Sequence, residues 1–322
     1  MTTMEPTPAT RPQADPATPS RRLPLGLRRL LGDPVTAGAL VFLCVVAICA
    51  LIGPALMGDL AEKPNFRARN MPPFSLDQGW SFVLGADTLG RSILARLIVA
   101  AQTTLGVAAS AVLCSLIMGG MLGLVAGYSK GRLGTIILRA TDIVMSFPSL
   151  LLALIVLYSL GPSITNLVIV LAITRIPIYL RTTRAEVMEV RQRMFVSAAE
   201  ALGASHARMI FRHIAPMVIP TLLTIGAIDF ATVVLAESSL SFLGLGVQTP
   251  AFTWGSMVAT GRGYLANAWW VAFWPGLAIL LTTLSLNILS GWWRTWSDPH
   301  QRWRLELDRK TLKRLNRKDK TA

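Results

Sequence analysis

Long runs of apolar residues dominate the chain and alternate with shorter polar stretches. Only a helix satisfies its own backbone hydrogen bonds across a bilayer, and about 20 residues are needed for the crossing. The sequence contains six such runs, at residues 37–57, 104–127, 143–160, 164–180, 217–243 and 269–292. Pro148 is expected to bend the third run, and Arg175 and Pro177 interrupt the fourth. The pattern therefore predicts an all-α membrane protein with six transmembrane helices.

An amphipathic segment, residues 195–216, separates the fourth and fifth runs. It carries two apolar stripes at helical spacing, Phe195, Ala198, Ala199 and Leu202, then Ala207, Ile210, Phe211 and Ile214. Gly203 predicts the end of a first short helix, Ser205 is a candidate N-cap for a second, and Pro216 precedes the fifth run. A segment this apolar needs a protein groove to cover it; an amphipathic helix lying flat on lipid is the alternative.

Four ionisable residues lie at or near membrane depth: Asp142, Arg175, Asp229 and Glu237. Because a carboxylate there is costly unless it is paired or wetted, Asp229 and Glu237 are expected to face other helices or a water-filled cavity. Two interpretations of Asp229 stay open. It pairs with Arg175 and locks two helices, or it offers negative charge to a positively charged group that crosses the bundle. Ser241, four residues after Glu237, is expected beside it.

The second run ends in three glycines one helical turn apart, Gly119, Gly123 and Gly127. Small residues at this spacing let the backbone of another helix approach closely. The partner is either a neighbouring span of the same chain or a second subunit.

Composition and charge agree with a membrane protein. Hydrophobic residues make up 52% of the chain and charged residues 15%, while the net charge is +14. One orientation of the six spans gathers most basic loops, the 195–216 segment and both termini on one side, and the positive-inside rule makes that side cytoplasmic. The charge therefore indicates orientation, and a nucleic-acid partner is not expected. Residues 1–36 are predicted as a cytoplasmic, largely disordered tail with a short basic interfacial helix, 37–300 as the membrane domain, and 301–322 as a basic cytoplasmic tail.

Common catalytic and nucleotide-binding motifs are absent from the sequence. It has no G-x-x-x-x-G-K-[ST] phosphate loop, no G-x-S-x-G elbow, no H-E-x-x-H pair and no Cys/His spacing typical of a metal site. We therefore expect no catalytic residue, cofactor or metal in this chain, and any ATP must be bound by a partner.

The run A-A-x-A-L-G-A followed by R-H-I-x-P resembles the EAA loop of ATP-binding-cassette (ABC) importer permeases. The matching positions are Ala198, Ala199, Ala201, Leu202, Gly203, Ile214 and Pro216. Ser197 stands where the family has its leading Glu, and Glu200 follows three residues later. The resemblance implies that the segment docks into a cleft on a cytoplasmic ATPase, through Ser197, Ala198, Ala199, Glu200, Leu202, Gly203, Ala204, Arg208, Phe211 and Arg212.

Further motifs resemble the dipeptide, oligopeptide and nickel branch of these permeases, in particular its C-type subunit. They are Asp87, Gly90 and Arg91 as D-x-x-G-R, the residues around Phe147, Pro148 and Ser149, and ESSLSFLGLGVQTP at the end of the fifth run. The resemblance implies the type I ABC importer permease fold with cytoplasmic coupling helices. Its translocation pathway is expected to include Asp229, Glu237, Arg175, Asp142 and Pro148.

The resemblance also implies the assembly and its location. The chain is expected to form half of the pathway of an ATP-driven importer of di- or oligopeptides in the bacterial inner membrane, with both termini cytoplasmic. Its expected partners are a homologous B-type permease, two ATPases that bind ATP and Mg²⁺, an extracytoplasmic solute-binding protein and membrane lipid. Nickel, glutathione or haem are alternative substrates, and an ATP-independent secondary transporter or channel is the alternative class.

Overall fold

The computed structural model describes residues 33–75, 79–129 and 131–297, and this part of the chain is helical. Its elements are α2 (Pro34–Glu62), η1 (Phe66–Ala68), η2 (Trp80–Phe82), α3 (Ile93–Tyr128), α4 (Arg132–Met145), α5 (Ser149–Leu160), α6 (Ile164–Arg191), α7 (Met194–Ala201), α8 (His206–Arg208), η3 (Met209–Ile214), α9 (Ala215–Phe242), α10 (Trp254–Gly261), η4 (Arg262–Tyr264) and α11 (Trp270–Ser297). Apart from 33–36, where α2 begins, the predicted tails 1–36 and 301–322 lie outside the described residues.

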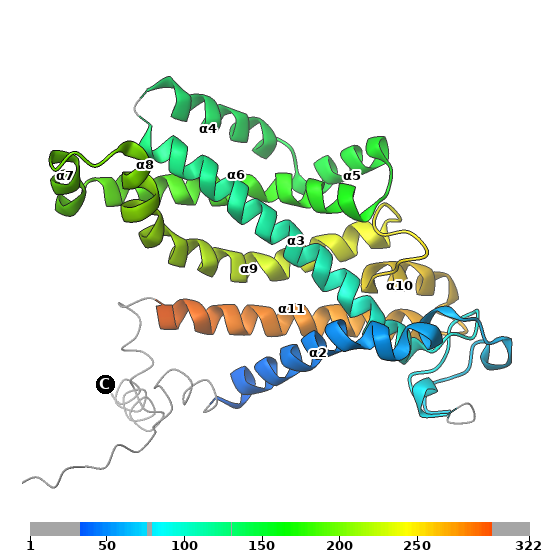
Figure 1. Cartoon of the computed structure of the whole chain (residues 1–322). Coiled ribbons are helices and arrows are strands. Elements are labelled where there is room, and N and C mark those ends of the chain that lie inside the picture. The colour runs from blue at the N-terminus through cyan, green and yellow to red at the C-terminus, as the bar shows by residue number, and fades with distance from the viewer. Residues whose placement is uncertain (1–32, 76–78, 130, 298–322) are drawn as a thin grey trace, which may run out of the picture.

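The long helices run between two ends of the molecule (Figure 1). We call the end that carries α7 and α8 the arm end, and the end that carries α10 and the loop 63–92 the loop end. The central helix is α3, which contacts α2, α6, α9 and α11. Within the described residues, five helices are long and apolar enough to cross a membrane: α2, α3, α6, α11, and α9 together with α8 and η3. These five confirm five of the predicted spans.

The third predicted span, 143–160, is divided between two helices by a sharp bend. Residues up to Met145 complete α4, and α5 begins only at Ser149, after a bend of 85°. Pro148 has no backbone N–H and disfavours helical geometry in the residue before it, so the expected bend at Pro148 is confirmed. Ser146 closes α4 by donating its hydroxyl to the Asp142 carbonyl at 2.8 Å. Since the 12 residues of α5 are too few to cross a bilayer, a sixth span requires both helices.

Helix α6 is longer and more regular than the sequence predicted. It continues through Arg175 and Pro177 and ends at Arg191, beyond the expected limit at residue 180. The last turns of α6 carry charged side chains, so the apolar run ends before the helix does. Helix α6 therefore reaches further toward the arm end than its apolar run.

The three spaced glycines of α3 form the seam with α6. A Cβ atom added at Gly119 would lie 2.7 Å from the Tyr179 Cβ, and one added at Gly127 would lie 2.7 Å from the Val187 Cβ. At Gly123 the same atom would collide with Thr183. The glycine pattern therefore packs inside the chain, which was the first of the two predicted alternatives. This seam fixes α6, and with it Arg175 and Tyr179, against the central helix.

Candidate functional site

A protruding arm, residues 194–214, begins with the short helix α7 and turns at Gly203. This glycine has φ of 79°, a left-handed conformation that side chains other than glycine adopt with strain. Ser205 then caps α8, because its hydroxyl accepts the backbone N–H of Arg208 at 3.4 Å. The predicted break at Gly203 and the predicted cap at Ser205 are both confirmed.

The second half of the arm is not the separate short helix that the sequence predicted. Helix α8 has three residues and passes through the π-helix η3 directly into α9. Pro216 has no N–H to donate, and the preceding N–H of Ala215 bonds to the Ile210 carbonyl five residues back. The wider turn thus joins the arm to α9 without a break at the proline. The second half of the arm and the span that contains α9 therefore form one continuous helix, His206–Phe242.

A few apolar side chains anchor the arm to the bundle. Val196, Met209 and Ile214 are buried and pack with Val187 and Val218 of the neighbouring spans. The predicted stripes did not single out Val196 or Met209. In a helix as short as α7, both faces carry apolar residues, so periodicity alone could not tell which face is buried.

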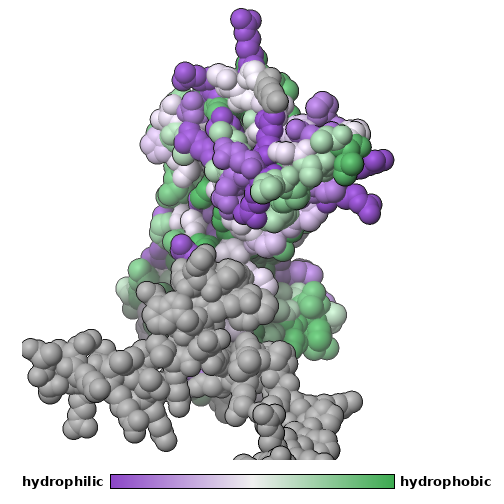
Figure 2. Space-filling view, turned by 90° about the vertical axis from the view of Figure 1, so that its left-hand side faces the viewer, coloured by the Kyte–Doolittle hydropathy of each residue, from purple (hydrophilic) through white to green (hydrophobic). Residues whose placement is uncertain are grey.

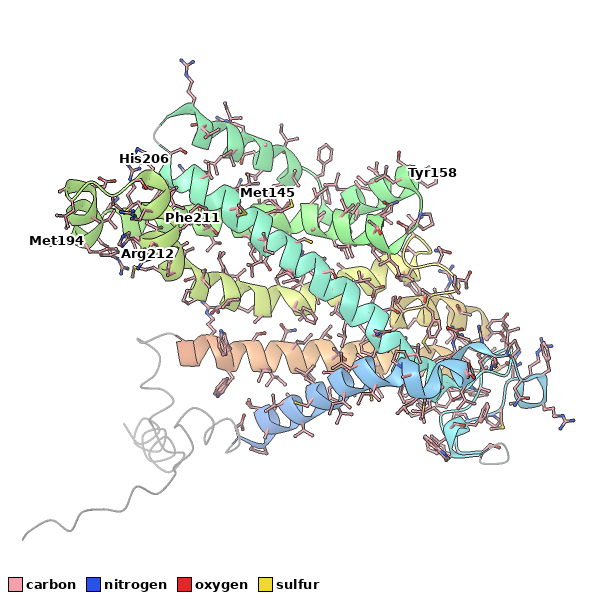
Figure 3. All side chains as sticks on the ribbon, viewed as in Figure 1. Met145, Tyr158, Met194, His206, Phe211 and Arg212 are labelled. Carbon is pink, nitrogen blue, oxygen red and sulfur yellow. The ribbon has the colours of Figure 1, made fainter. Side chains whose placement is uncertain are left out.

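The predicted stripe residues largely face outward. The exposed fraction is 40% for Phe195, 89% for Leu202 and 62% for Phe211, and Met194 reaches 90%. Figure 3 shows Met194 and Phe211 at the arm end, together with His206 and Arg212. Viewed from this end the surface is mostly hydrophilic, and hydrophobic patches interrupt it (Figure 2). None of the described residues covers this apolar side of the arm.

The remaining predicted coupling residues lie around these apolar groups. Ser197, Ala198, Glu200, Gly203, Arg208 and Arg212 are exposed, whereas Ala199 and Ala204 are half-buried. The arm therefore presents apolar, acidic and basic groups together, a combination suited to a protein surface.

A contact that the sequence did not reveal ties the arm to the end of α3. The Tyr128 hydroxyl lies 2.9 Å from Nδ1 of His206. The Arg191 guanidinium lies 5.1 Å from the centroid of the Tyr128 ring and donates to the Tyr128 carbonyl at 3.1 Å. Tyr128 thus connects α3, α6 and the arm. Tyr128 directly follows Gly127, the last residue of the second apolar run, and that pattern does not indicate the contact.

Inside the bundle, Asp229 of α9 lies against α6. Its carboxylate is 3.6 Å from the Arg175 guanidinium and accepts the Tyr179 hydroxyl at 3.2 Å. The predicted Arg175 partner is present, and Tyr179 was not foreseen because a contact between helices depends on their packing. In this conformation the contact matches the helix-locking interpretation, since Asp229 is buried and the ion pair bridges two spans.

Glu237 has a different environment from Asp229. It is fully buried, and it accepts the Ser241 hydroxyl at 2.7 Å and the Ser238 hydroxyl at 3.2 Å. The expected neighbour Ser241 is confirmed. Because Glu237 bonds to serines of its own helix and to Thr253 at the start of α10, whereas Asp229 bonds across to α6, the two acids do not form one acidic surface.

The other two proposed pathway residues lie apart from the Asp229 cluster. Asp142 of α4 pairs with Arg181 at 2.6 Å and with Arg139 at 3.8 Å. Pro148 precedes α5 at the bend, beside a cavity of about 240 Å³ lined by residues of α4, α5 and α6, Val144, Met145, Phe147, Ser149, Leu152 and Thr174. Asp142 thus ties α4 to α6, whereas Pro148 lies at the α4–α5 bend.

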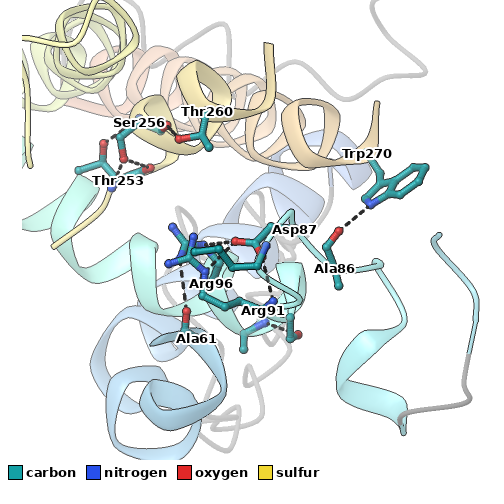
Figure 4. A network of polar contacts seen from close by, with 12 residues as sticks. Ala61, Ala86, Asp87, Arg91, Arg96, Thr253, Ser256, Thr260 and Trp270 are labelled. Carbon is teal, nitrogen blue, oxygen red and sulfur yellow. Dashed lines mark hydrogen bonds and ion pairs between the residues drawn. The ribbon is translucent and has the colours of Figure 1, made fainter. Parts of the chain in front are cut away.

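The D-x-x-G-R motif builds the loop end (Figure 4). Asp87 accepts the backbone N–H of Leu89 and of Arg91, and its other oxygen accepts Nε of Arg91 at 2.7 Å. The pair lies in a turn before α3, not on a helix face. Arg96 lies 4.0 Å from the same carboxylate and donates to the Ala61 carbonyl, which joins α2 to α3.

Comparisons with known proteins agree with these features. The profile of the family described as "Binding-protein-dependent transport system inner membrane component" matches residues 119–303, more than half of the chain. The Di/tripeptide transport system permease protein DppC of Pseudomonas aeruginosa is 40% identical over 81% of this chain and 87% of its own length.

Two relatives from Escherichia coli K12 are each 34% identical. One is the Probable D,D-dipeptide transport system permease protein DdpC, matched over 84% of this chain and 89% of its own length. The other is the Nickel transport system permease protein NikC, matched over 80% of this chain and 92% of its own length. With its membrane-spanning helices and a connected arm, this chain belongs to the family of inner-membrane permease components of binding-protein-dependent ABC importers.

Proposed function

We propose that this permease forms half of the translocation pathway of an ATP-driven importer of di- and oligopeptides. Two of the three relatives above are named as peptide permeases, which supports this substrate class. A homologous second permease supplies the other half, and an extracytoplasmic solute-binding protein delivers the substrate. The nickel-named relative keeps nickel as the second candidate, and glutathione or haem are further alternatives.

The observation that carries the proposal is the uncovered apolar side of the arm. Exposed groups such as Leu202 and Phe211 are unfavourable in water and become stable when a partner buries them. Glu200, Arg208 and Arg212 provide polar contacts around them. The occupant is one of two cytoplasmic ATPases, whose cleft receives the arm. ATP and Mg²⁺ are bound by those ATPases and not by this chain.

The proposed orientation places the arm end in the cytoplasm, together with both termini. Helix α4 begins with Arg132 near the arm end, and the basic residues of 184–213 belong to the last turns of α6 or to the arm. In membrane proteins, loops rich in Lys and Arg lie on the cytoplasmic side of the bilayer. The loop end then faces the solute-binding protein.

The helix connections suggest how ATP hydrolysis drives transport. When the ATPases close, they move the arm, and η3 transmits this movement to α9 without an intervening loop. Asp229 on α9 then shifts relative to Arg175 and Tyr179 on α6, so the ion pair is strained or exchanged. Such coupling requires that the ATPases bind the arm with different affinity in the two states.

Charge placed on the apolar side of the arm tests the proposal. In Leu202→Asp, a carboxylate enters the buried part of the interface, so we expect loss of ATPase co-purification and of peptide uptake at normal membrane levels. Phe66→Asp is the matched control, because Phe66 is 72% exposed at the loop end. Retained ATPase binding and uptake in Leu202→Asp would contradict the proposed docking.

A further inference from the structure

A cavity of about 390 Å³ lies at the arm end, between the last turn of α3 and the last two turns of α6. Its lining consists of Ala126, Gly127, Ser129, Arg184, Met188, Arg191 and Gln192. This volume lies within the range of small-ligand pockets, roughly 300–1,000 Å³. The family resemblance and the proposed coupling mechanism assign no role to this cavity.

The charge in the cavity wall is uncompensated. Two guanidinium groups, those of Arg184 and Arg191, line the cavity, and no carboxylate does so among the described residues. The nearby acids of α6 point to other partners: Glu186 accepts the Thr221 hydroxyl of α9, and Glu189 pairs with Arg193. On α7, Glu200 lies beside the Tyr128 hydroxyl.

One of the two arginines also lacks a hydrogen-bond acceptor. The Arg184 Nε is buried and makes no hydrogen bond to any described residue. A buried donor without an acceptor is unfavourable, more so when it carries charge. An anionic group in the cavity would supply the negative charge that the two lining arginines, Arg184 and Arg191, lack there.

The donors around the cavity select the chemical class of the anion. Guanidinium groups bind phosphate through parallel N–H donors, and the Ser129 hydroxyl and Gln192 amide add neutral donors. Ala126 and Met188 supply an apolar part of the wall that suits a carbon substituent. The mixture fits a phosphate ester better than a bare ion.

We infer that this cavity binds a phosphate group, and that the group is the headgroup of an acidic phospholipid. The position supports the lipid source, because the lining residues Ala126 and Gly127 end the apolar run 104–127 of α3. A span leaves the hydrocarbon and reaches the headgroups where its apolar run ends, and basic pockets between helices at the cytoplasmic side bind acidic headgroups. Inorganic phosphate is the alternative source of the same chemistry.

An occupied site would also act on the arm. Arg191 holds the ring and carbonyl of Tyr128, and Tyr128 contacts His206. A phosphate that fixes Arg191 therefore stabilises the contact between α3 and the arm. The inference deepens the proposed coupling function, but lipid binding is measured independently of transport.

The test measures binding of phosphatidylglycerol to the purified permease–ATPase complex by native mass spectrometry and by titration in detergent. Arg184→Gln removes the unpaired donor and its charge, and we expect about a tenfold loss of affinity. Arg181→Gln is the control for binding, since Arg181 is on the same helix, pairs with Asp142 and does not line the cavity. Unchanged ATPase co-purification shows that each variant is folded.

Titration with inorganic phosphate separates the two sources. Binding of phosphatidylglycerol that weakens in Arg184→Gln but not in Arg181→Gln supports the inference. Binding of inorganic phosphate alone, with the same dependence on Arg184, would overturn the lipid source. Equal affinities of wild type and Arg184→Gln for both ligands would overturn the site.

Discussion

The two ends of the molecule differ in how their side chains are partnered within the chain. At the loop end, Asp87 receives donors from its own turn, and the indole N–H groups of Trp254 and Trp270 donate to the carbonyls of Leu97 and Ala86. At the arm end, Leu202 and Phe211 remain exposed. These polar groups of the loop end find their partners within one chain, although apolar side chains such as Phe66 are exposed there too, and the exposed apolar groups of the arm fit the proposed docking.

The difference shows which contacts serve folding and which serve assembly. A substitution at the loop end removes contacts that the isolated chain already makes, so it should lower the stability of the chain. A substitution on the outer side of the arm removes few contacts, so it should spare folding and abolish coupling. Comparing matched substitutions at the two ends tests this division.

Gly90→Val should have the largest effect on stability. Gly90 has φ of 74°, and a Cβ atom there would collide with the Asn65 carbonyl oxygen. Strain and collision together should destabilise the protein by more than about 3 kcal/mol, enough to prevent its accumulation. Membrane levels and thermal unfolding measure the effect. Normal membrane levels with an unchanged melting temperature would contradict the expectation that contacts at the loop end stabilise the chain.

Asp229→Ala should have the next largest effect. It leaves the Arg175 guanidinium without its carboxylate and the Tyr179 hydroxyl without its acceptor. We expect a loss of about 3 kcal/mol, near the low end for a broken buried pair because the Arg175 side chain is 21% exposed. Thermal unfolding of the purified complex measures it.

Asp229→Asn then separates the two interpretations of this acid. If Asp229 attracts the amino terminus of a peptide, the variant should change the relative uptake of cationic and neutral peptides. If it only locks helices, uptake of both should fall together or stay unchanged. A transport assay with the two peptide classes in competition distinguishes these results.

Gly203→Val should have the smallest effect on stability and a large effect on transport. Its φ of 79° is strained for valine by about 1–3 kcal/mol, but a Cβ atom there meets nothing within 4 Å. We expect normal membrane levels and loss of uptake, because the turn between α7 and α8 changes shape. Gly263→Val, at an open position without positive φ, is the control. Normal uptake in Gly203→Val would separate the turn from coupling.

Features with a local cause could be predicted from the sequence. Long apolar runs predicted α2, α3, α6, α9 and α11, since a span depends on its own length and hydrophobicity. Pro148 predicted the bend, and Gly203 with Ser205 predicted the turn of the arm, because each acts through its own backbone or nearest neighbours. The spaced glycines likewise predicted the close approach of another helix, and the structure identifies that helix as α6.

Features that depend on packing between distant segments could not be predicted. Tyr179 meets Asp229 across 50 residues of sequence, and Tyr128 meets His206 across 78. The separation between Asp229 and Glu237 follows from different partners, which a helical projection does not show. The buried face of α7 and the cavity beside Arg184 depend in the same way on how the arm and α6 pack against the rest of the chain.

The π-helix η3 makes rotation of α9 possible as well as displacement. A π-turn contains about one residue more than an α-turn, so the chain holds a spare residue between the arm and the span. Tightening this turn to α-helical geometry would rotate everything beyond it by about 100° around the axis of α9. A small adjustment at the membrane surface would thus present a different face of the helix to the translocation pathway.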